Sequence, residues 1–360
     1  MPSSAKSPAP FDTTKFVNTA QVGGIESYRI GDGAGRGVRA LCVNTGGGLR
    51  YRILVDRGFD IDQALFKEQS LAFLTHKGVT PPAQGIERGI DWLHMFPGGL
   101  LTTCGPFNAG PPGDDNGEAL PLHGVHSNTP ATIESIVQPD PHAGRQEMSA
   151  VARLRYGKLF GPCLDLKRTI RSVLGTNHID IADEFFNAGN TPAPHAWLLH
   201  INFGYPLVDG GAELCYDAAK VEPRNEPGSI ARFKNLAAAR KVPDALEEHR
   251  GGTETFAYLW PRAAKDGSAT VAIVNRKRGM AVAIHYNTKE FPRCGNWQHF
   301  GPGEYVTALE PMNCTVDGRW KDRAAGNLDF IKPGERKTYQ YRIEVVTEKA
   351  GLEALRKLNG

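Results

Sequence analysis

The sequence carries little excess charge of either sign. Its 42 basic and 39 acidic residues leave a formal charge of +3 over 360 residues. A protein whose main partner is nucleic acid usually concentrates basic side chains on one face. The longest basic cluster, Arg276–Arg278, lies between two apolar runs and is typical of a solvated hairpin turn. We therefore do not expect nucleic acid as the main partner.

Cysteine is scarce, and so are long apolar runs. The six cysteines are scattered without a CxxC pair, which argues against a disulfide framework or a structural zinc site. No apolar run approaches the length that spans a bilayer, and the first residues lack the apolar core of a secretory signal. These features predict a cytoplasmic protein without a membrane partner.

Helical patterns are also few. The clearest is a leucine stripe at helical spacing near the end of the chain, which predicts a helix over residues 347–360. The alanine-rich stretch Ala231–Arg240 is a second candidate. Residues 1–12 are rich in Ser, Pro and Ala and are expected to form a flexible N-terminal arm. No repeat or linker divides residues 13–346, so we expect one domain there, with the C-terminal helix packed on it.

The sequence is rich in short segments that alternate apolar and polar residues. Leu49–Val55, Met280–Tyr286 and Tyr339–Val345 each place an apolar side chain at every second position, as half-buried antiparallel strands do. Asn275–Gly279 predicts a hairpin turn before the second of these segments. Many short strands without alternating helices indicate a mainly β fold, a single-domain antiparallel sandwich with few short helices.

One acidic residue, Glu310, lies inside an apolar, strand-like run that ends at Pro311. Aromatic residues, including Trp297 and Phe300, precede it closely. Burial disfavours the charged form of a carboxyl group and raises its pKa toward neutrality. A carboxyl group tuned in this way is a candidate general base, which needs an acidic partner.

Two histidine motifs supply candidate partners for Glu310. His200 and Asn202 would share one face of a strand and make it doubly polar, although a histidine bonded to a backbone carbonyl in the core would have the same pattern. His123 and His126 would face opposite sides of a strand. Both reach one site only if Gly124 breaks that strand.

Other side chains are candidate contacts for a ligand. Arg57 follows a strand, and its planar guanidinium suits hydroxyls or a carboxylate, although an ion pair with a nearby aspartate explains it equally well. Trp297 and Tyr205 could stack on the apolar face of a sugar ring, and Gln298 adds a polar group beside Trp297. Each aromatic residue could equally belong to the core.

Six segments together resemble the aldose 1-epimerase (galactose mutarotase-like) superfamily, and most closely its DUF4432 branch. In order, over roughly residues 35–346, they are LVDRGFDID, PGGLLTTCG, LHGVHSNTPA, LLHINFGYPLV, ALEPMNC and KPGERKTYQYRI. The resemblance implies a β-supersandwich with a shallow sugar cleft on one sheet.

The resemblance also implies an activity. In mutarotases a glutamate near the C-terminus removes the proton of the anomeric hydroxyl, and a histidine protonates the ring oxygen. By resemblance Glu310 takes the first role, His200 takes the second, and His123 contacts the sugar near the ring. This implies a sugar isomerase that exchanges the anomers of a reducing sugar without a cofactor, acting as a monomer or homodimer. The expected substrate contacts are Arg57, His126, Asn202, Tyr205, Trp297 and Gln298.

Two other functions fit the same residues. His123, His200 and Glu310, with His126 as an optional fourth ligand, could instead hold a divalent metal ion. Such an ion would polarise the carbonyl of a keto-sugar for isomerisation, epimerisation or elimination. The same scaffold could also bind a carbohydrate without transforming it.

Overall fold

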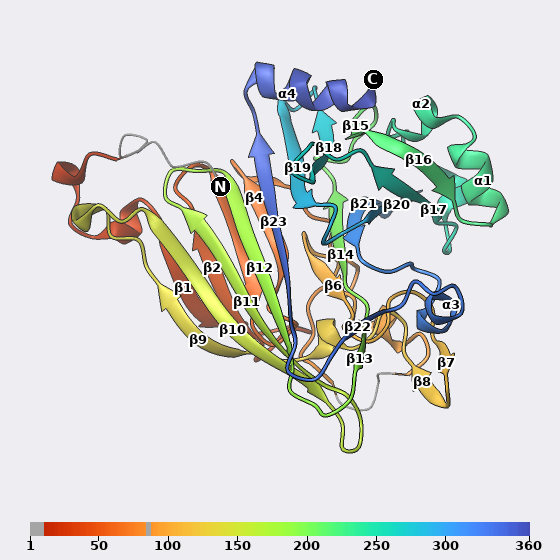
Figure 1. Cartoon of the computed structure of the whole chain (residues 1–360). Helices are drawn as coiled ribbons and strands as arrows, with labels where there is room; N and C mark the ends of the chain where they lie inside the picture. Colours follow the sequence, from red (N-terminus) through yellow and green to blue (C-terminus); the bar gives the residue numbers. More distant parts are fainter. Residues whose placement is uncertain (1–10, 84–87) are drawn as a thin grey trace.

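The computed structural model describes residues 11–83 and 88–360, in which antiparallel strands predominate (Figure 1). The expected mainly β, sandwich-like fold is confirmed. Most of the predicted arm, residues 1–12, lies outside the described residues. Its last two residues belong to the fold, because Phe11 packs against the main core and Asp12 accepts a hydrogen bond from the backbone of Thr14.

One layer of the fold is an antiparallel sheet, the eight-stranded sheet. In spatial order its strands are β15 (Glu213–Tyr216), β18 (Ser268–Asn275), β19 (Met280–Asn287), β23 (Arg336–Val346), β12 (His178–Asn187), β11 (Cys163–Val173), β10 (Glu147–Gly157) and β9 (Thr132–Val137). Strand β23 pairs with β19 on one side and β12 on the other. The last strand of the chain therefore joins two hairpin systems into one layer.

The second layer contains the six-stranded sheet. In spatial order its strands are β16 (Ala218–Pro223), β17 (Thr255–Pro261), β20 (Arg293–Gly301), β21 (Glu304–Met312), β14 (Leu198–Gly204) and β6 (Thr102–Cys104). Every residue of β14 is buried, and so are the last seven residues of β21. One face of these strands packs on the core, while the other lies beneath loops.

A five-stranded sheet extends the second layer. Its strands are β1 (Gly24–Arg29), β2 (Arg39–Asn44), β3 (Leu49–Leu54), β4 (Asp60–Phe66) and β5 (Gln69–Ser70). Bridges between Ile61 and Leu101 and between Ala72 and Phe203 join it to the six-stranded sheet. Two further pairs are short: β7 (Gly113–Asp115) with β8 (Glu118–Leu120), and β13 (Ala193–His195) with β22 (Asp329–Ile331).

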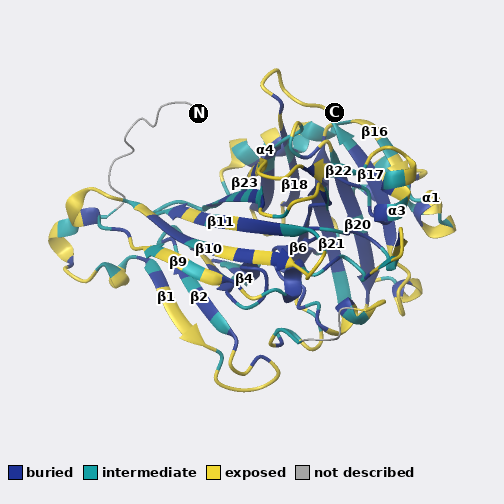
Figure 2. Cartoon of the chain, turned by 60° about the horizontal axis from the view of Figure 1, so that its bottom comes forward, coloured by how far each residue is buried: buried dark blue, intermediate teal, exposed yellow. Residues whose placement is uncertain are grey.

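The main hydrophobic core lies between the two layers. It takes side chains from all three large sheets. Figure 2 shows the buried residues along the inner strands and the exposed ones on outer strands such as β1 and β9. The alternating segments predicted from the sequence supply these inward-facing side chains.

The predicted hairpin at Asn275–Gly279 is confirmed, since β18 pairs antiparallel with β19 from Asn275 opposite Met280 onward. The prediction that β19 is half buried was wrong. Ala281 and Ala283, on its second face, are also buried, because Leu352 and Leu355 of the C-terminal helix pack against them.

Helices are few and short, as expected. In the described residues the α-helices are α1 (Pro227–Phe233), α2 (Leu236–Ala239), α3 (Arg319–Ala324) and α4 (Lys349–Arg356). The 3-10 helices are η1 (Thr13–Lys15), η2 (Thr19–Gln21), η3 (Asp91–His94), η4 (His126–Asn128), η5 (Pro141–Ala143), η6 (Glu247–His249) and η7 (Lys357–Asn359). The alanine-rich stretch forms two helices, because Asn235 caps α2 and interrupts the run. Over the residues placed in the structure, none of these helices is long and apolar enough to cross a membrane.

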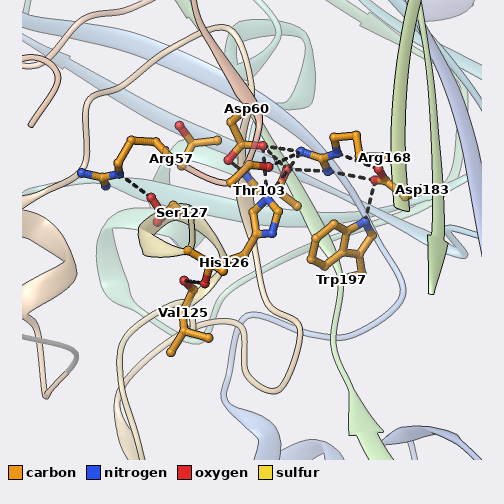
Figure 3. A network of polar contacts seen from close by, with 12 residues as sticks. Arg57, Asp60, Thr103, Val125, His126, Ser127, Arg168, Asp183 and Trp197 are labelled. Atoms are coloured by element: carbon orange, nitrogen blue, oxygen red, sulfur yellow. Dashed lines mark hydrogen bonds and ion pairs between the residues drawn. The ribbon is translucent and has the colours of Figure 1, made fainter. Parts of the chain in front are cut away.

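A buried ionic cluster ties the three sheets together (Figure 3). Arg168 on β11 is completely buried and donates two hydrogen bonds to Asp183 on β12 and one, of 2.6 Å, to Asp60 on β4. Its guanidinium also donates to the hydroxyl of Thr103 on β6, which in turn donates to Asp60. Burial alone would raise the pKa of Asp60, but His126 and Arg168 hold it below its usual range.

Substituting Arg168 with Met should therefore destabilise the fold strongly. Asp60 and Asp183 would stay buried without their cation, and removing one partner from such a cluster costs ~3–5 kcal/mol of unfolding free energy. Urea unfolding measures the loss. Arg153→Met on the neighbouring strand β10 is the matched control, because Arg153 forms only a surface ion pair with Glu134, worth about 0–1 kcal/mol. Equal stability of the two variants would contradict a structural role for the cluster.

Candidate functional site

A cavity of about 680 Å³ lies on the loop-covered face of the six-stranded sheet. Its floor consists of side chains from β14, β17, β20 and β21. Segments around Trp92, Phe96 and His123 form one wall, and Phe73 belongs to another. Much of the lining is apolar and aromatic, with a few polar groups among it. This composition is typical of small-molecule sites.

Glu310 and His200 lie side by side at the floor of this cavity. The register of β14 on β21, with Leu198 opposite Met312 and Ile201 opposite Leu309, places His200 across from Glu310. Nε2 of His200 is 3.3 Å from Oε1 of Glu310. Only 2% of Glu310 and 6% of His200 are exposed, so each group's pKa is set largely by the protein around it.

Burial moves the two pKa values in opposite directions. Desolvation raises the pKa of Glu310 to about 8, and the positive charge of Arg224 partly opposes this rise. Desolvation lowers the pKa of His200 to about 4, with the side chain of Asn202 acting in the other direction. Between these values both groups are neutral, because Glu310 carries its carboxyl proton and His200 is not protonated to an imidazolium.

The third predicted residue, His123, lines the cavity above this pair. Its ring centroid is 5.9 Å from that of His200, and the two rings are nearly perpendicular. Trp92 packs against the same ring at 4.6 Å between centroids and is 6.3 Å from the ring of His200. Glu310, His200 and His123 therefore converge in one cavity, as the sequence predicted.

Backbone contacts define the tautomer of His123. The amide N–H of Gly110 donates to Nδ1 of His123 at 3.2 Å, while the His123 amide donates to the Gly110 carbonyl. Burial, with the added effect of His200 and Arg224, lowers the pKa of His123 to about 3. A neutral ring that accepts at Nδ1 carries its proton on Nε2. His123 is therefore a neutral hydrogen-bond donor.

His126 and Arg57 do not line the cavity, in contrast to the prediction. Gly124, at φ 72°, turns the chain so that His126 points into the core, where it contacts Tyr156 and Asp60 (Figure 3). The guanidinium of Arg57 donates to the backbone carbonyls of Ser127, Thr80 and Met95. Both side chains are fully engaged in holding the loop that carries His123.

Three further predicted contacts also lie outside the cavity lining. Asn202 shares the His200 face of β14, but the carbonyl of Gly99 covers it and accepts its amide hydrogen bond. Gln298 cannot face the cavity when its neighbour Trp297 does, because adjacent residues of a strand point to opposite faces. Tyr205 is exposed on the surface, near Arg278. Trp297 does line the cavity.

Several lining residues were not predicted from the sequence. Arg224 follows β16, and Glu254 precedes β17. His299, Glu304 and His76 lie toward another part of the cavity. His299 could have been found, since it is two residues beyond Trp297 on one strand and so shares its face. Glu304 could also have been found, because it lies six residues before Glu310 on β21 and shares its face. Arg224, Glu254 and His76 come from connecting segments that carry no local signal.

The proposed metal-ligand set has a different geometry from a metal site. Nδ1 of His123 accepts the Gly110 amide, and His200 and Glu310 contact each other. Across residues 11–83 and 88–360, no group of three or more His, Cys, Asp or Glu side chains is arranged to hold a metal ion. The three side chains do not form such a group here, and metal dependence stays a prediction.

The fold is that of the galactose mutarotase-like proteins. The chain belongs to the DUF4432 family, described as a domain of unknown function, whose model matches residues 35–345. No protein with a curated description matches the sequence.

Solved structures share the fold at low sequence identity. A Klebsiella pneumoniae protein, named provisionally as an aldose 1-epimerase, superposes with a TM-score of 0.84 at 20% identity, over 95% of this chain and 90% of its own. A galactose mutarotase-like protein from Clostridium acetobutylicum gives 0.62 at 12% identity, over 90% and 98% of the two chains. Galactose 1-epimerase from Lactobacillus acidophilus gives 0.57 at 11% identity, over 89% and 98%. These likenesses show the fold.

The tautomer of His123 can be tested directly. In long-range ¹⁵N NMR spectra, we expect the His123 ring to carry its proton on Nε2 and to stay neutral between pH 5 and pH 9, because its pKa is about 3. His123→Gln assigns the signals, and the exposed His142 serves as an internal reference. A proton on Nδ1, or protonation near the usual value of 6.5, would contradict the hydrogen-bond assignment.

Proposed function

We propose that this protein is a sugar 1-epimerase, an isomerase that exchanges the anomers of a reducing sugar by opening and closing its hemiacetal ring. The contact between Glu310 and His200 at the cavity floor carries this proposal. Ring opening needs a base at the anomeric hydroxyl and an acid at the ring oxygen. Both oxygens are bonded to the same carbon, so the acid and the base must lie next to each other.

The starting protonation state determines which group acts first. With the proton on Glu310, the carboxyl group is the initial acid and the neutral imidazole of His200 is the initial base. Glu310 donates to the ring oxygen, His200 takes the hydroxyl proton, the bond between C1 and the ring oxygen breaks, and C1 becomes a carbonyl carbon. This order is the reverse of the one that the resemblance implied, because burial raises one pKa and lowers the other.

The second half of the reaction restores the pair. After rotation about the bond between C1 and C2, His200 returns its proton to the carbonyl oxygen and Glu310 takes the proton from the former ring hydroxyl. The ring closes as the other anomer, and both side chains end in their starting states. Each positioned acid or base contributes ~10²–10⁴-fold to such a rate.

Other cavity residues have supporting roles in this proposal. The Nε2–H of His123 is oriented as a donor to a sugar oxygen near the ring. Trp297 is partly exposed to the cavity and offers an aromatic face to the apolar side of a pyranose. Arg224 keeps the pKa of Glu310 from rising further. The reaction needs no redox cofactor.

Replacing Glu310 with Gln should lower the rate of anomer exchange by ~10²–10⁴-fold, because the amide can neither donate nor accept the transferred proton in the same way. NMR exchange spectroscopy on a panel of free aldoses and sugar acids measures this rate. Glu222→Gln is the matched control, since Glu222 is exposed and pairs with Lys220 on the edge strand β16. Wild-type exchange in the Glu310 variant would contradict the assignment.

The same assay separates the alternative functions. We expect anomer exchange to continue in EDTA, and its loss with recovery on adding one equivalent of a divalent ion would favour the metal-assisted isomerase. Sugar binding without exchange or any new product would instead favour a carbohydrate-binding protein.

A further inference from the structure

A second polar cluster lies at the far end of the cavity. The carboxylate of Glu304 sits between two imidazoles, with Oε2 3.2 Å from Nε2 of His299 and Oε1 3.6 Å from Nε2 of His76. All three residues line the cavity that contains Glu310. The Glu304 side chain is 40% exposed, so its oxygens can accept further hydrogen bonds.

This cluster is displaced along β21 from the Glu310–His200 pair. Glu304 and Glu310 both lie on β21, six positions apart and on the same face. At about 3.3 Å per residue, their backbone positions are ~20 Å apart along the strand. Both groups line one cavity of about 680 Å³, which has room for more than one pyranose ring.

An aromatic surface connects the two ends. Trp297 lies between them on β20, and its ring is nearly parallel to that of His299, with 14° between the planes and 6.5 Å between the centroids. On the other side, the ring of His200 is 5.4 Å from Trp297. Phe73 and Val306 also line this stretch.

We propose that the cavity has two sugar subsites and that the substrate is a reducing disaccharide or a longer oligosaccharide. The reducing unit occupies the Glu310–His200 end, so this inference rests on the proposed function. The next glycosyl unit lies over Trp297, and Glu304 and His299 accept and donate hydrogen bonds to its hydroxyls. Stacking on an aromatic face with a carboxylate at the rim is the chemistry that recognises a sugar ring and its hydroxyls.

The experiment compares each monosaccharide with a disaccharide that has the same reducing unit. The pairs are glucose with cellobiose or maltose, galactose with galactobiose, mannose with mannobiose, and xylose with xylobiose. We expect kcat/KM for anomer exchange to be at least tenfold higher for one disaccharide than for its own monosaccharide. Glu304→Gln should reduce this ratio about tenfold, the usual effect of one hydrogen bond to a charged group.

Two further variants make the test robust. His76→Gln changes a largely exposed ring at the same subsite and should lower the ratio without affecting folding. Glu222→Gln, at an exposed residue outside the cavity lining, should leave the ratio unchanged. Circular dichroism checks that each variant is folded.

The outcomes separate the two proposals. Anomer exchange with no preference for any disaccharide would overturn the second subsite and leave the proposed function standing. If no sugar is exchanged, calorimetry on the same pairs decides. Tighter binding of a disaccharide that is lost in Glu304→Gln would support the second subsite and overturn the epimerase, whereas equal or absent binding of both sugars would overturn the subsite too.

Discussion

The burial of Glu310 against His200 is the constraint around which the cavity is organised. Removal from water makes the carboxyl group a weaker acid and the imidazole a weaker base. The pair therefore holds one proton without net charge, a state that a cavity lined mostly by apolar groups can accommodate. A group that carries a transferable proton beside a group that can accept one is also what a concerted proton exchange requires.

The rest of the fold holds this pair and its cover in place. Sheet register brings the two side chains together, because β14 and β21 are neighbours and antiparallel. His123 depends on a loop, and that loop is held by Arg57 through backbone carbonyls and by His126, which contacts the buried ionic cluster around Arg168. The cluster that joins the three sheets thus also supports one wall of the cavity.

Much of this arrangement could be predicted from the sequence. Period-two patterns located the strands, and a carboxyl group in an apolar run marked Glu310. His200 was predicted from its place beside Asn202 on the polar face of a strand. His123 was predicted from a histidine motif that Gly124 interrupts. Strand alternation should also have excluded Gln298, since Trp297 beside it was expected at the site.

Tertiary contacts account for the remaining differences. The side chains of Arg57 and His126 could bind a ligand, but both already form hydrogen bonds with residues distant in sequence. Asn202 shares the predicted face, and a segment about 100 residues earlier covers it. Arg224 and His76 reach the cavity from segments with no periodic pattern, so their roles depend on how distant parts of the chain converge.

The most direct test of the central claim is an NMR titration of Glu310. In protein labelled with ¹³C at the glutamate carboxyl group, the signal that disappears in Glu310→Gln belongs to this residue. The account predicts that it stays protonated through neutral pH and titrates with a pKa of about 8. Titration near the usual value of 4.5 would show that the pair does not hold its proton on the carboxyl group and would contradict the account.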